Sequence, residues 1–349
     1  QFTAGNGSTV ERSQNFGVAR KATEIRPARP RIVVLDAATF GDASLERFAA
    51  CWDCTIHPVT HPGELAPRLQ GHSVAITNKV AFNRAVLGSP QARDLKLIAV
   101  AATGTDIIDL ETARRAGVRV CNVPGYATHS VAQFTLALVL QLATRVCQYR
   151  NAARRGDWQR SPIFTLLEYP AIELNGKKLG IVGYGGIGRT VAAMARGFGL
   201  EVLIGAKAGH SGPLPADRLP LEILFREADI ITLHCPLTPE TKNLINRQSL
   251  AWMKPSAFLI NTARGALVDE EALLQALREK RLGGAALDVL VQEPPRPGQP
   301  LLEAAGEMGN LIITPHTAWS AREARERLLR EVAENIRAFV AGDRRNIVV

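Results

Sequence analysis

The sequence predicts an α/β protein built from two doubly wound parallel-sheet domains with a cleft between them. Short apolar runs rich in Val and Ile recur along the chain without polar alternation, which is typical of strands covered on both faces. Helical stretches separate these runs, and the alternation starts a second time near Lys177. With 349 residues the chain is long enough for two domains, each with its own core. Two βα series in tandem therefore define the expected architecture.

The first series begins at Arg31. Its expected strands are RIVVLD, TIHPV, SVAITN, LKLIAVAA and VRVCNV, and its expected helices are SLERFAA, PGELAPRLQ and DLETARRAG. One long helix is then expected over residues 129–153. Its apolar run is interrupted by Gln133 and Gln141 and is too short to span a bilayer, so it is predicted to be buried or to lie at a dimer interface.

The second series begins at Lys177. Its expected strands are KKLGIVG, VLIG, ADIITLH, AFLINTA, GGAALDV and NLIITPH. Helices are expected through TVAAMARGFG, from Asp269 onward, and in the charged amphipathic segment SAREARERLLREVAENIRAFVAG near the C-terminus. No internal repeat is visible.

Composition and charge indicate a cytoplasmic protein without a nucleic-acid or membrane partner. The net charge is +9, but part of it lies in the first thirty residues, and the Arg-rich C-terminal helix is interleaved with Glu, as in a solvated helix face. Residues 1–30 lack periodicity and lack the apolar core of a secretion signal, so a disordered leader is expected, with a transit peptide as the alternative. The five cysteines are interpreted as reduced thiols, and no metal site is expected.

The motif GYGGIG predicts a dinucleotide site. It directly follows an apolar strand and directly opens a helix, which is the context this motif requires. Gly183 permits a tight turn, Gly185 lets the backbone approach a pyrophosphate, and Gly188 lets helix and strand pack closely. The N–H groups at the helix start, from Gly186 onward, then face the phosphates.

The next strand lacks the acid that usually binds the adenosine ribose. Gly205, Ala206 and Lys207 stand at that place, and no acid follows until Asp217. Without a carboxylate to repel a 2′-phosphate, and with Lys207 and His210 as positive groups, NADPH is expected to be accepted at least as well as NADH.

Polar residues follow successive strands of the second series. Arg264, Glu293 and His316 each have an ordinary explanation alone: a helix cap, a surface acid and a loop histidine. Together they place a guanidinium, a carboxylate and an imidazole at the carboxyl edge of one sheet, where ligands bind in open parallel sheets.

These three groups match the chemistry of 2-oxo acid reduction. A guanidinium fixes the substrate carboxylate, and an imidazolium donates a proton to the alkoxide that hydride transfer creates. A neighbouring carboxylate favours the imidazolium form. Arg264 is therefore predicted to bind substrate, His316 to act as acid and base, and Glu293 to orient and charge His316, with Asp288 as a candidate for holding the nicotinamide carboxamide.

From about Arg31 to Val349 the chain resembles the D-isomer-specific 2-hydroxyacid dehydrogenase family. The resemblance rests on GYGGIG, HCPLTPETKNLI, INTARGALVDEEAL, GAALDVLVQEPP and TPHTAW, in this order. Through ITNKV and VAATGTDIIDL it is most similar to the glycerate dehydrogenases, also called hydroxypyruvate or glyoxylate reductases. The resemblance implies reduction of hydroxypyruvate or glyoxylate to D-glycerate or glycolate with NAD(P)H, the catalytic set Arg264, Glu293 and His316, and a homodimer.

The resemblance also implies where substrate and cofactor bind. Backbone groups of Thr103 and Gly104 would face the substrate carboxylate. Lys79 is a candidate second anion contact, and Trp319 either packs in the core or walls the substrate pocket. The residues expected to line the cofactor are Thr128, Gly183, Gly185, Gly186, Ile187, Gly188, Ala206, Lys207, His234, Cys235, Pro236, Thr241, Thr262, Ala263, Asp288 and His316.

The family's smaller domain is discontinuous. This implies a flavodoxin-like substrate domain of residues 31–122 plus 317–349 and a Rossmann cofactor domain of residues 123–316. Two alternatives remain at this stage. A phosphoglycerate dehydrogenase is disfavoured because only 33 residues follow His316 and no extra Arg/Lys cluster is evident. A co-repressor-type binding module, which also has a Trp soon after the histidine, is disfavoured because no nuclear signal is evident.

Overall fold

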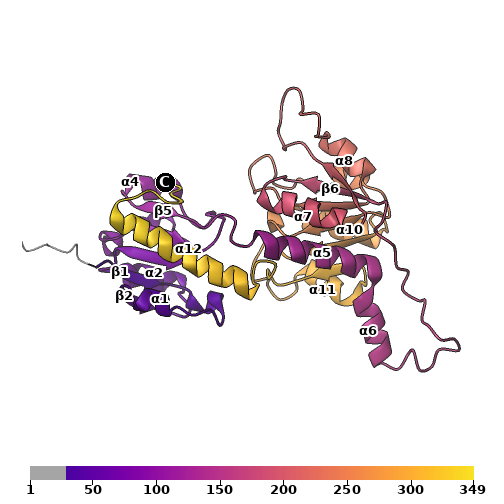
Figure 1. The fold of residues 1–349 in the computed structure, drawn as a ribbon, viewed down its shortest axis with the longest axis horizontal. Coiled ribbons are helices and arrows are strands. Elements are labelled where there is room, and N and C mark those ends of the chain that lie inside the picture. Colours follow the sequence, from indigo (N-terminus) through magenta and orange to yellow (C-terminus); the bar gives the residue numbers. More distant parts are fainter. Residues whose placement is uncertain (1–28) are drawn as a thin grey trace, which may run out of the picture.

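Two separate parallel sheets organise residues 29–349, the part of the chain that the computed structural model describes (Figure 1). The first sheet has the strand order β2-β1-β3-β4-β5, and the second has the order β11-β10-β9-β8-β6-β7. Every strand pair is parallel, so the predicted fold class is confirmed. The predicted leader, residues 1–30, lies outside the described residues apart from its last two positions.

The strands are short, with three to five residues each. The first sheet contains β1 (Arg31–Val34), β2 (Asp53–Ile56), β3 (Val74–Thr77), β4 (Leu97–Val100) and β5 (Arg119–Cys121). The second contains β6 (Lys178–Val182), β7 (Glu201–Ile204), β8 (Ile230–Leu233), β9 (Phe258–Asn261), β10 (Gly284–Leu287) and β11 (Leu311–Ile313). All eleven lie within the strands expected from the apolar runs, or overlap them.

Helices connect these strands and cover the sheets. Those of the first series are α1 (Glu46–Ala49), α2 (Pro62–Leu69), α3 (Arg84–Leu87) and α4 (Leu110–Arg115). Those that follow are α5 (Thr128–Thr144), α6 (Val146–Arg154), α7 (Gly186–Arg196), α8 (Leu221–Glu227), α9 (Arg247–Trp252), α10 (Glu270–Arg278), α11 (Pro300–Glu307) and α12 (Arg322–Ala341). The short helices α3, α8, α9 and α11 were not expected, although α1, α2 and α4, which are equally short, were.

Each sheet is buried on both faces, and this explains the apolar runs. In β1, Ile32 and Val34 point into one core, whereas Val33 points into the core on the opposite face. Strands β2 to β5 continue these two cores, and β6 to β11 have two further cores of their own. Because successive side chains of a strand alternate between faces, a strand covered twice needs apolar residues at every position.

The C-terminal helix α12 packs against the first sheet, far from its neighbours in sequence (Figure 1). Leu328 and Val332 of α12 join the same core as Ile32. Arg325 donates a hydrogen bond to the carbonyl of Phe40 at 2.7 Å. The first sheet is therefore completed by a segment that follows the second sheet in the sequence.

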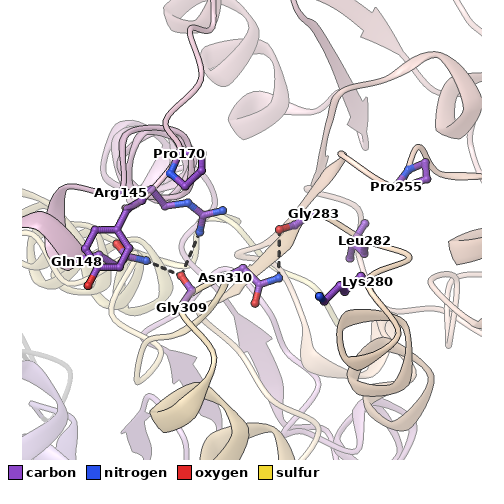
Figure 2. Close-up of a pocket in the computed structure, with 10 residues that line it drawn as sticks. Arg145, Gln148, Pro170, Pro255, Lys280, Leu282, Gly283, Gly309 and Asn310 are labelled. Atoms are coloured by element: carbon purple, nitrogen blue, oxygen red, sulfur yellow. Dashed lines mark hydrogen bonds between the residues drawn. The ribbon is translucent and has the colours of Figure 1, made fainter. Parts of the chain in front are cut away.

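The single long helix expected over residues 129–153 is wrong. The structure breaks it at Arg145, which adopts a left-handed conformation (φ 57°) and separates α5 from α6. Figure 2 shows the contacts beside the break: the Arg145 guanidinium donates to the carbonyl of Gly309 (3.1 Å), which also accepts a hydrogen bond from Gln148. Arg145, Gln148 and Gly309 line a pocket of about 630 Å³ beside the start of β11. The break is thus stabilised by partners that are distant in sequence.

Within residues 29–349, no single helix is long and apolar enough to cross a membrane. Only α5 and α6 taken together reach the necessary length and composition, and they are bent by 61° at Arg145. The apolar character of α5 has another explanation, because Val131, Leu136, Val139 and Leu142 are all buried within the protein.

Candidate active site

A cleft joins the carboxyl ends of the two sheets. It consists of two adjoining pockets of about 930 and 390 Å³, and both are lined by residues from each sheet. Lys79 and Asp106 come from loops of the first sheet, whereas Arg264 and His316 come from loops of the second. The polar residues that follow separate strands are therefore brought to one cavity.

His316 and Glu293 form a hydrogen-bonded pair in this cleft. The distance between Nδ1 of His316 and Oε2 of Glu293 is 2.6 Å, and Oε1 of Glu293 accepts from the backbone N–H of Leu290 at 2.9 Å. Burial alone raises the pKa of Glu293, but the hydrogen bond and charge of His316 outweigh it, so its pKa lies below the usual value. Glu293 is thus ionised at neutral pH, and Nε2 of His316 is the nitrogen left for a substrate.

Asp288 holds the loop that carries His316. Its carboxylate accepts hydrogen bonds from the Thr314 hydroxyl (2.6 Å) and from the backbone N–H groups of Thr317 (2.9 Å) and Ala318 (2.8 Å). The backbone N–H of His316 donates to the Asp288 carbonyl, and His316 itself is left-handed with φ 54°. The Asp288 carboxylate therefore supports the His316 loop, and its expected contact with a nicotinamide carboxamide stays a prediction.

Arg264 extends from the end of β9 toward the first sheet. The buried side chain of Asn261 fixes the turn before it, donating to the Arg264 carbonyl (2.8 Å) and accepting from the Ala263 N–H (3.0 Å). Nη1 of Arg264 donates to the Ala263 carbonyl at 2.8 Å, and Nε lies 3.1 Å from Oδ2 of Asp106. The guanidinium is therefore held in the cleft by contacts with both sheets.

Lys79 enters the cleft from a loop that Asp36 positions. The buried carboxylate of Asp36 accepts from the backbone N–H groups of Asn78 (3.0 Å) and Lys79 (2.6 Å). Burial, followed by the positive charge of Arg264, lowers the pKa of Lys79. The Lys79 ammonium forms no ion pair with any residue of the described chain, so a second cation faces the cavity beside Arg264.

Thr103 and Gly104 follow β4 and line the same cavity. None of the residues in the 29–349 range accepts a hydrogen bond from the backbone N–H of Thr103 or Gly104. A Cβ on Gly104 would overlap Nη2 of Arg264, so a larger residue there would displace the guanidinium from this position. Two unpaired N–H groups and a guanidinium consequently lie together, which suits a carboxylate ligand.

Trp319 lines both pockets of the cleft. Its indole packs edge-on against Tyr126, with ring centroids 6.3 Å apart. One part of the ring thus packs against the protein and another borders the cavity, and the role of Trp319 in limiting the substrate side chain stays a prediction.

The glycine motif has the geometry that a dinucleotide site requires. Gly183 has φ 95°, and a Cβ there would lie 2.4 Å from the backbone nitrogen of Cys235. A Cβ on Gly188 would lie 2.2 Å from the Gly183 carbonyl, so helix α7 packs directly on the turn. Both positions are restricted to glycine by the protein itself.

Gly185 and Gly186 serve a different purpose. A Cβ on Gly185 would meet no protein atom within 4 Å, and one on Gly186 would approach only the side chain of Thr128. Open space thus lies above the start of α7, and the N–H groups of that helix end face it. A pyrophosphate fits this space, so the residues present are compatible with a nicotinamide dinucleotide.

The loops after β8 and β9 complete the expected cofactor wall, which comprises His234, Cys235, Pro236, Thr262, Ala263 and, from α7, Ile187. Burial lowers the pKa of His234 to about 4, so the imidazole is neutral, and neither ring nitrogen has a partner in the described chain. Burial also raises the pKa of the Cys235 thiol to about 11. Thr241 is buried and its hydroxyl bonds to Pro236 and Thr238, so it shapes the loop rather than facing a ligand.

The loop after β7 carries Ala206, Lys207 and His210. Ala206 is nearly buried, whereas Lys207 and His210 are exposed. Glu240, from the loop after β8, lies against this loop, because a Cβ on Gly209 would be 2.9 Å from its Cγ. A hydrogen bond with Thr238 and, more weakly, the charge of Lys207 lower the pKa of Glu240.

Sequence reasoning missed four residues that shape the site: Asp36, Asp106, Asn261 and Glu240. Asp36 ends the run RIVVLD and Asn261 ends AFLIN, so a polar residue closing an apolar strand was an available signal. Asp106 and Glu240 carried no local signal, because their importance depends on partners in other loops. No group of three or more His, Cys, Asp or Glu side chains within residues 29–349 is arranged to hold a metal ion.

Comparisons with known proteins identify the family. Residues 136–318 match the family model described as D-isomer specific 2-hydroxyacid dehydrogenase, NAD binding domain. The chain is 45% identical to a glycerate dehydrogenase of Methylorubrum extorquens, over 82% of this chain and 88% of that protein. It is 34% identical to a hydroxypyruvate reductase of Blautia hydrogenotrophica, over 91% and 99%. The crystal structure of the TT0316 protein from Thermus thermophilus superposes with a TM-score of 0.79 at 39% identity, covering 91% of this chain and 100% of that one.

Two parallel-sheet domains, a glycine-rich cradle and an Arg–His–Glu cleft define a nicotinamide-dependent oxidoreductase. The chain belongs to the D-isomer-specific 2-hydroxyacid dehydrogenase family, whose members transfer hydride between a nicotinamide cofactor and small 2-oxo or 2-hydroxy acids. The predicted family is confirmed, and the alternative of a co-repressor-type binding module is set aside because the matched relatives are enzymes.

Proposed function

We propose that this enzyme reduces hydroxypyruvate and glyoxylate to D-glycerate and glycolate. The observation that carries the proposal is the grouping of Arg264, Lys79 and the His316–Glu293 pair around one cavity. Two cations suit a small anionic substrate, and the imidazole supplies a proton. The names of the relatives, glycerate dehydrogenase and hydroxypyruvate reductase, support the same substrates.

Substrate binding rests on Arg264 and the loop at Thr103 and Gly104. The guanidinium offers N–H donors to a carboxylate, and the two backbone N–H groups add donors from the opposite sheet. Anchoring the carboxylate from both sides fixes the adjacent carbonyl carbon in the cleft. Lys79 adds positive charge, and Trp319 limits the space for a substrate side chain.

Proton transfer rests on His316. A bound nicotinamide supplies or accepts the hydride. The oxygen of the substrate carbonyl then gains negative charge, and Nε2 of His316 donates the proton that neutralises it. Glu293 holds the ring through Nδ1 at 2.6 Å, which leaves Nε2 to face the substrate. In the oxidation direction the same nitrogen accepts the proton.

NADPH is proposed as an accepted cofactor, at least as good as NADH. The proposal rests on Ala206 at the place of the ribose-binding acid and on the exposed Lys207 beside it. An Ala206→Asp variant is expected to shift the ratio of kcat/KM values toward NADH, because a carboxylate there repels a 2′-phosphate. An unchanged cofactor ratio in this variant contradicts the proposal.

A steady-state panel tests the reaction. Hydroxypyruvate, glyoxylate, pyruvate and 3-phosphohydroxypyruvate are each assayed with NADH and with NADPH. Arg264→Ala is expected to lower kcat/KM for hydroxypyruvate by about 100-fold or more, since a charge-assisted anchor is lost. Arg93→Ala, at an exposed arginine far from the cleft, is the matched control and should match wild type. The proposed reaction is wrong if wild type and Arg264→Ala show the same negligible rate.

We further propose that the enzyme is a cytoplasmic homodimer. The segment that follows α6 projects from the rest of the protein (Figure 1). It exposes Phe164 (89%), Leu167 (73%) and Trp158 (57%), and clustered apolar exposure of this kind is typical of an interface. The five cysteines, which are free thiols, suit a reducing compartment.

Sedimentation velocity tests the assembly. Wild type is expected to sediment as a dimer, and the double variant Phe164→Ser/Leu167→Ser as a monomer. Val59→Ser, at an exposed valine of the first sheet's domain, is the control and should remain dimeric. A monomeric wild type rules out the dimer.

We also propose the division into two domains that the family resemblance implies. Residues 31–122 with 317–349 would form the substrate domain, and residues 123–316 the cofactor domain. The cores support this division for the two sheets, because β1 to β5 share apolar neighbours with α12, whereas β6 to β11 share theirs with α7 to α11. Val123, Tyr126 and Val131, from the start of the proposed cofactor domain, pack into the core of the first sheet.

A further inference from the structure

Arg218 lies on the far side of β7 from the glycine motif, yet its side chain reaches that motif. Residue 219 pairs with Gly205 as a parallel extension of the sheet beyond β7, and the Ala206 N–H donates to the Leu219 carbonyl at 2.8 Å. On the other side of β7 lies β6, which leads into Tyr184 of GYGGIG. The Arg218 guanidinium stands over the Tyr184 ring, 4.9 Å from its centroid.

This contact places a guanidinium across the carboxyl end of β7. In the sheet, β7 lies between β6 and the segment at residue 219. A side chain that reaches from this segment to the residues after β6 therefore passes over the carboxyl end of β7. The carboxyl end of the second strand of a dinucleotide-binding unit is where the adenosine ribose binds. Arg218 is therefore placed at the carboxyl end of β7, where a ribose would bind.

The N–H donors of the Arg218 guanidinium are available to a ligand. Its side chain is only 25% exposed, and its nearest carboxylate oxygen, from Asp217, is 3.5 Å from Nε. Its side chain donates no hydrogen bond to any residue among those that the structure describes. An arginine has five N–H donors in a fixed fork that matches a phosphate. Stacking on Tyr184 fixes the plane of this fork while leaving its edge available.

We propose that Arg218, stacked on Tyr184, binds the 2′-phosphate of the adenosine ribose of NADP(H) and so determines cofactor preference. This inference rests on the proposed acceptance of NADPH and assigns it to a residue outside the β7 loop. Lys207, an exposed residue of the loop after β7, then has a secondary part. Ala206 contributes by leaving room for the phosphate where an acid would repel it.

Calorimetric titration with 2′,5′-ADP and 5′-ADP separates the 2′-phosphate from the rest of the ligand. Wild type should bind 2′,5′-ADP more tightly than 5′-ADP. Arg218→Ala should lower the affinity for 2′,5′-ADP by roughly 10- to 100-fold, the range expected for hydrogen bonds to a charged group. It should change the affinity for 5′-ADP by less than about threefold. Arg218→Lys should recover part of the affinity, because the charge remains and the fork is lost.

Arg226→Ala is the matched control, because Arg226 is exposed on α8 and pairs with Glu222. It should bind both probes as wild type does, and circular dichroism should show that all variants are folded. If Arg218→Ala lowers the affinity for both probes equally, Arg218 stacks on the adenine and the proposal is overturned. Unchanged affinity for 2′,5′-ADP in this variant overturns it as well. If wild type binds neither probe, the assignment of the dinucleotide site is wrong. If wild type binds both probes with equal affinity, only the proposed preference for NADPH is wrong.

Discussion

Nε of Arg264 lies 3.1 Å from Oδ2 of Asp106, so an ion pair spans the cleft between residues 158 positions apart. Asp106 belongs to the loop after β4, and Arg264 follows β9. The pair occupies the Nε edge of the guanidinium and leaves Nη2 beside the backbone of Gly104. Asp106 thus presets the orientation in which Arg264 meets a substrate carboxylate.

Asp106→Asn is predicted to raise KM for hydroxypyruvate by about two- to tenfold, because the ligand must then order the arginine itself. The kcat value should change less, and Asp106→Glu should restore part of the affinity. Thermal stability should barely change, since exposed ion pairs contribute about 0–1 kcal/mol. A lower KM in the variant would show instead that Asp106 competes with the substrate.

Glu293→Gln is predicted to move the pH profile. In wild type the hydrogen bond and charge of His316 outweigh burial and lower the pKa of Glu293, so the carboxylate stays charged throughout the neutral range. Reduction needs the proton of His316, so kcat/KM falls as pH rises. An opposite charge at hydrogen-bond distance favours the charged form of a group, so removal of the Glu293 charge should move this fall toward acid. Oxidation needs the unprotonated histidine, so kcat/KM for oxidation should begin to rise at a lower pH in the variant. A lower rate with an unmoved profile contradicts the assigned role.

Asp288→Ala is predicted to disorder the His316 loop. The change leaves the backbone N–H groups of Thr317 and Ala318 unpaired in a buried place, which costs about 1–3 kcal/mol of unfolding free energy for each such group. Chemical denaturation measures this loss, and kcat should fall with it. Dinucleotide affinity should change little. Loss of cofactor affinity without loss of stability would support the expected role of Asp288 in holding the nicotinamide.

Two glycines of the motif should respond differently to alanine. Gly185→Ala is predicted to fold as wild type, because no protein atom lies within 4 Å of the added Cβ, but to lose dinucleotide affinity. Gly183→Ala is predicted to lose stability, since φ is 95° and the Cβ would meet backbone atoms. Thermal melting and nucleotide titration distinguish the two effects. Equal nucleotide affinity in wild type and Gly185→Ala would show that the open space is not used by the ligand.

Trp319→Leu is predicted to widen the substrate pocket. Larger 2-oxo acids with branched side chains should gain kcat/KM by roughly tenfold relative to hydroxypyruvate, the range that a few methylene groups contribute in a pocket. Leu302→Ala, at an exposed residue on the rim of the larger pocket, is the control. An unchanged substrate ratio would assign the indole to packing against Tyr126 alone.

Local sequence patterns were informative where one segment decides its own structure. The apolar run around Val33 predicts a strand buried on both faces, and GYGGIG predicts the turn at Gly183 and the start of α7. Short helices such as α9 were missed because they are held by capping at Asn246 rather than by a long periodic face. The helix break at Arg145 was missed because its stabilising partner, Gly309, is 164 residues away.

The sequence by itself determined the two parallel sheets, the dinucleotide cradle and the residue types at the strand ends, because these depend on side-chain periodicity and glycine geometry within short segments. The catalytic roles of Arg264, Glu293 and His316 stay predictions, although the structure brings the three into one cleft. Only the tertiary structure decided which groups are already engaged. Asp288 is bound to its loop, Arg264 to Asp106, and Arg218 lies over Tyr184. These pairings depend on sheet order and on packing between segments far apart in the chain, which no local pattern records.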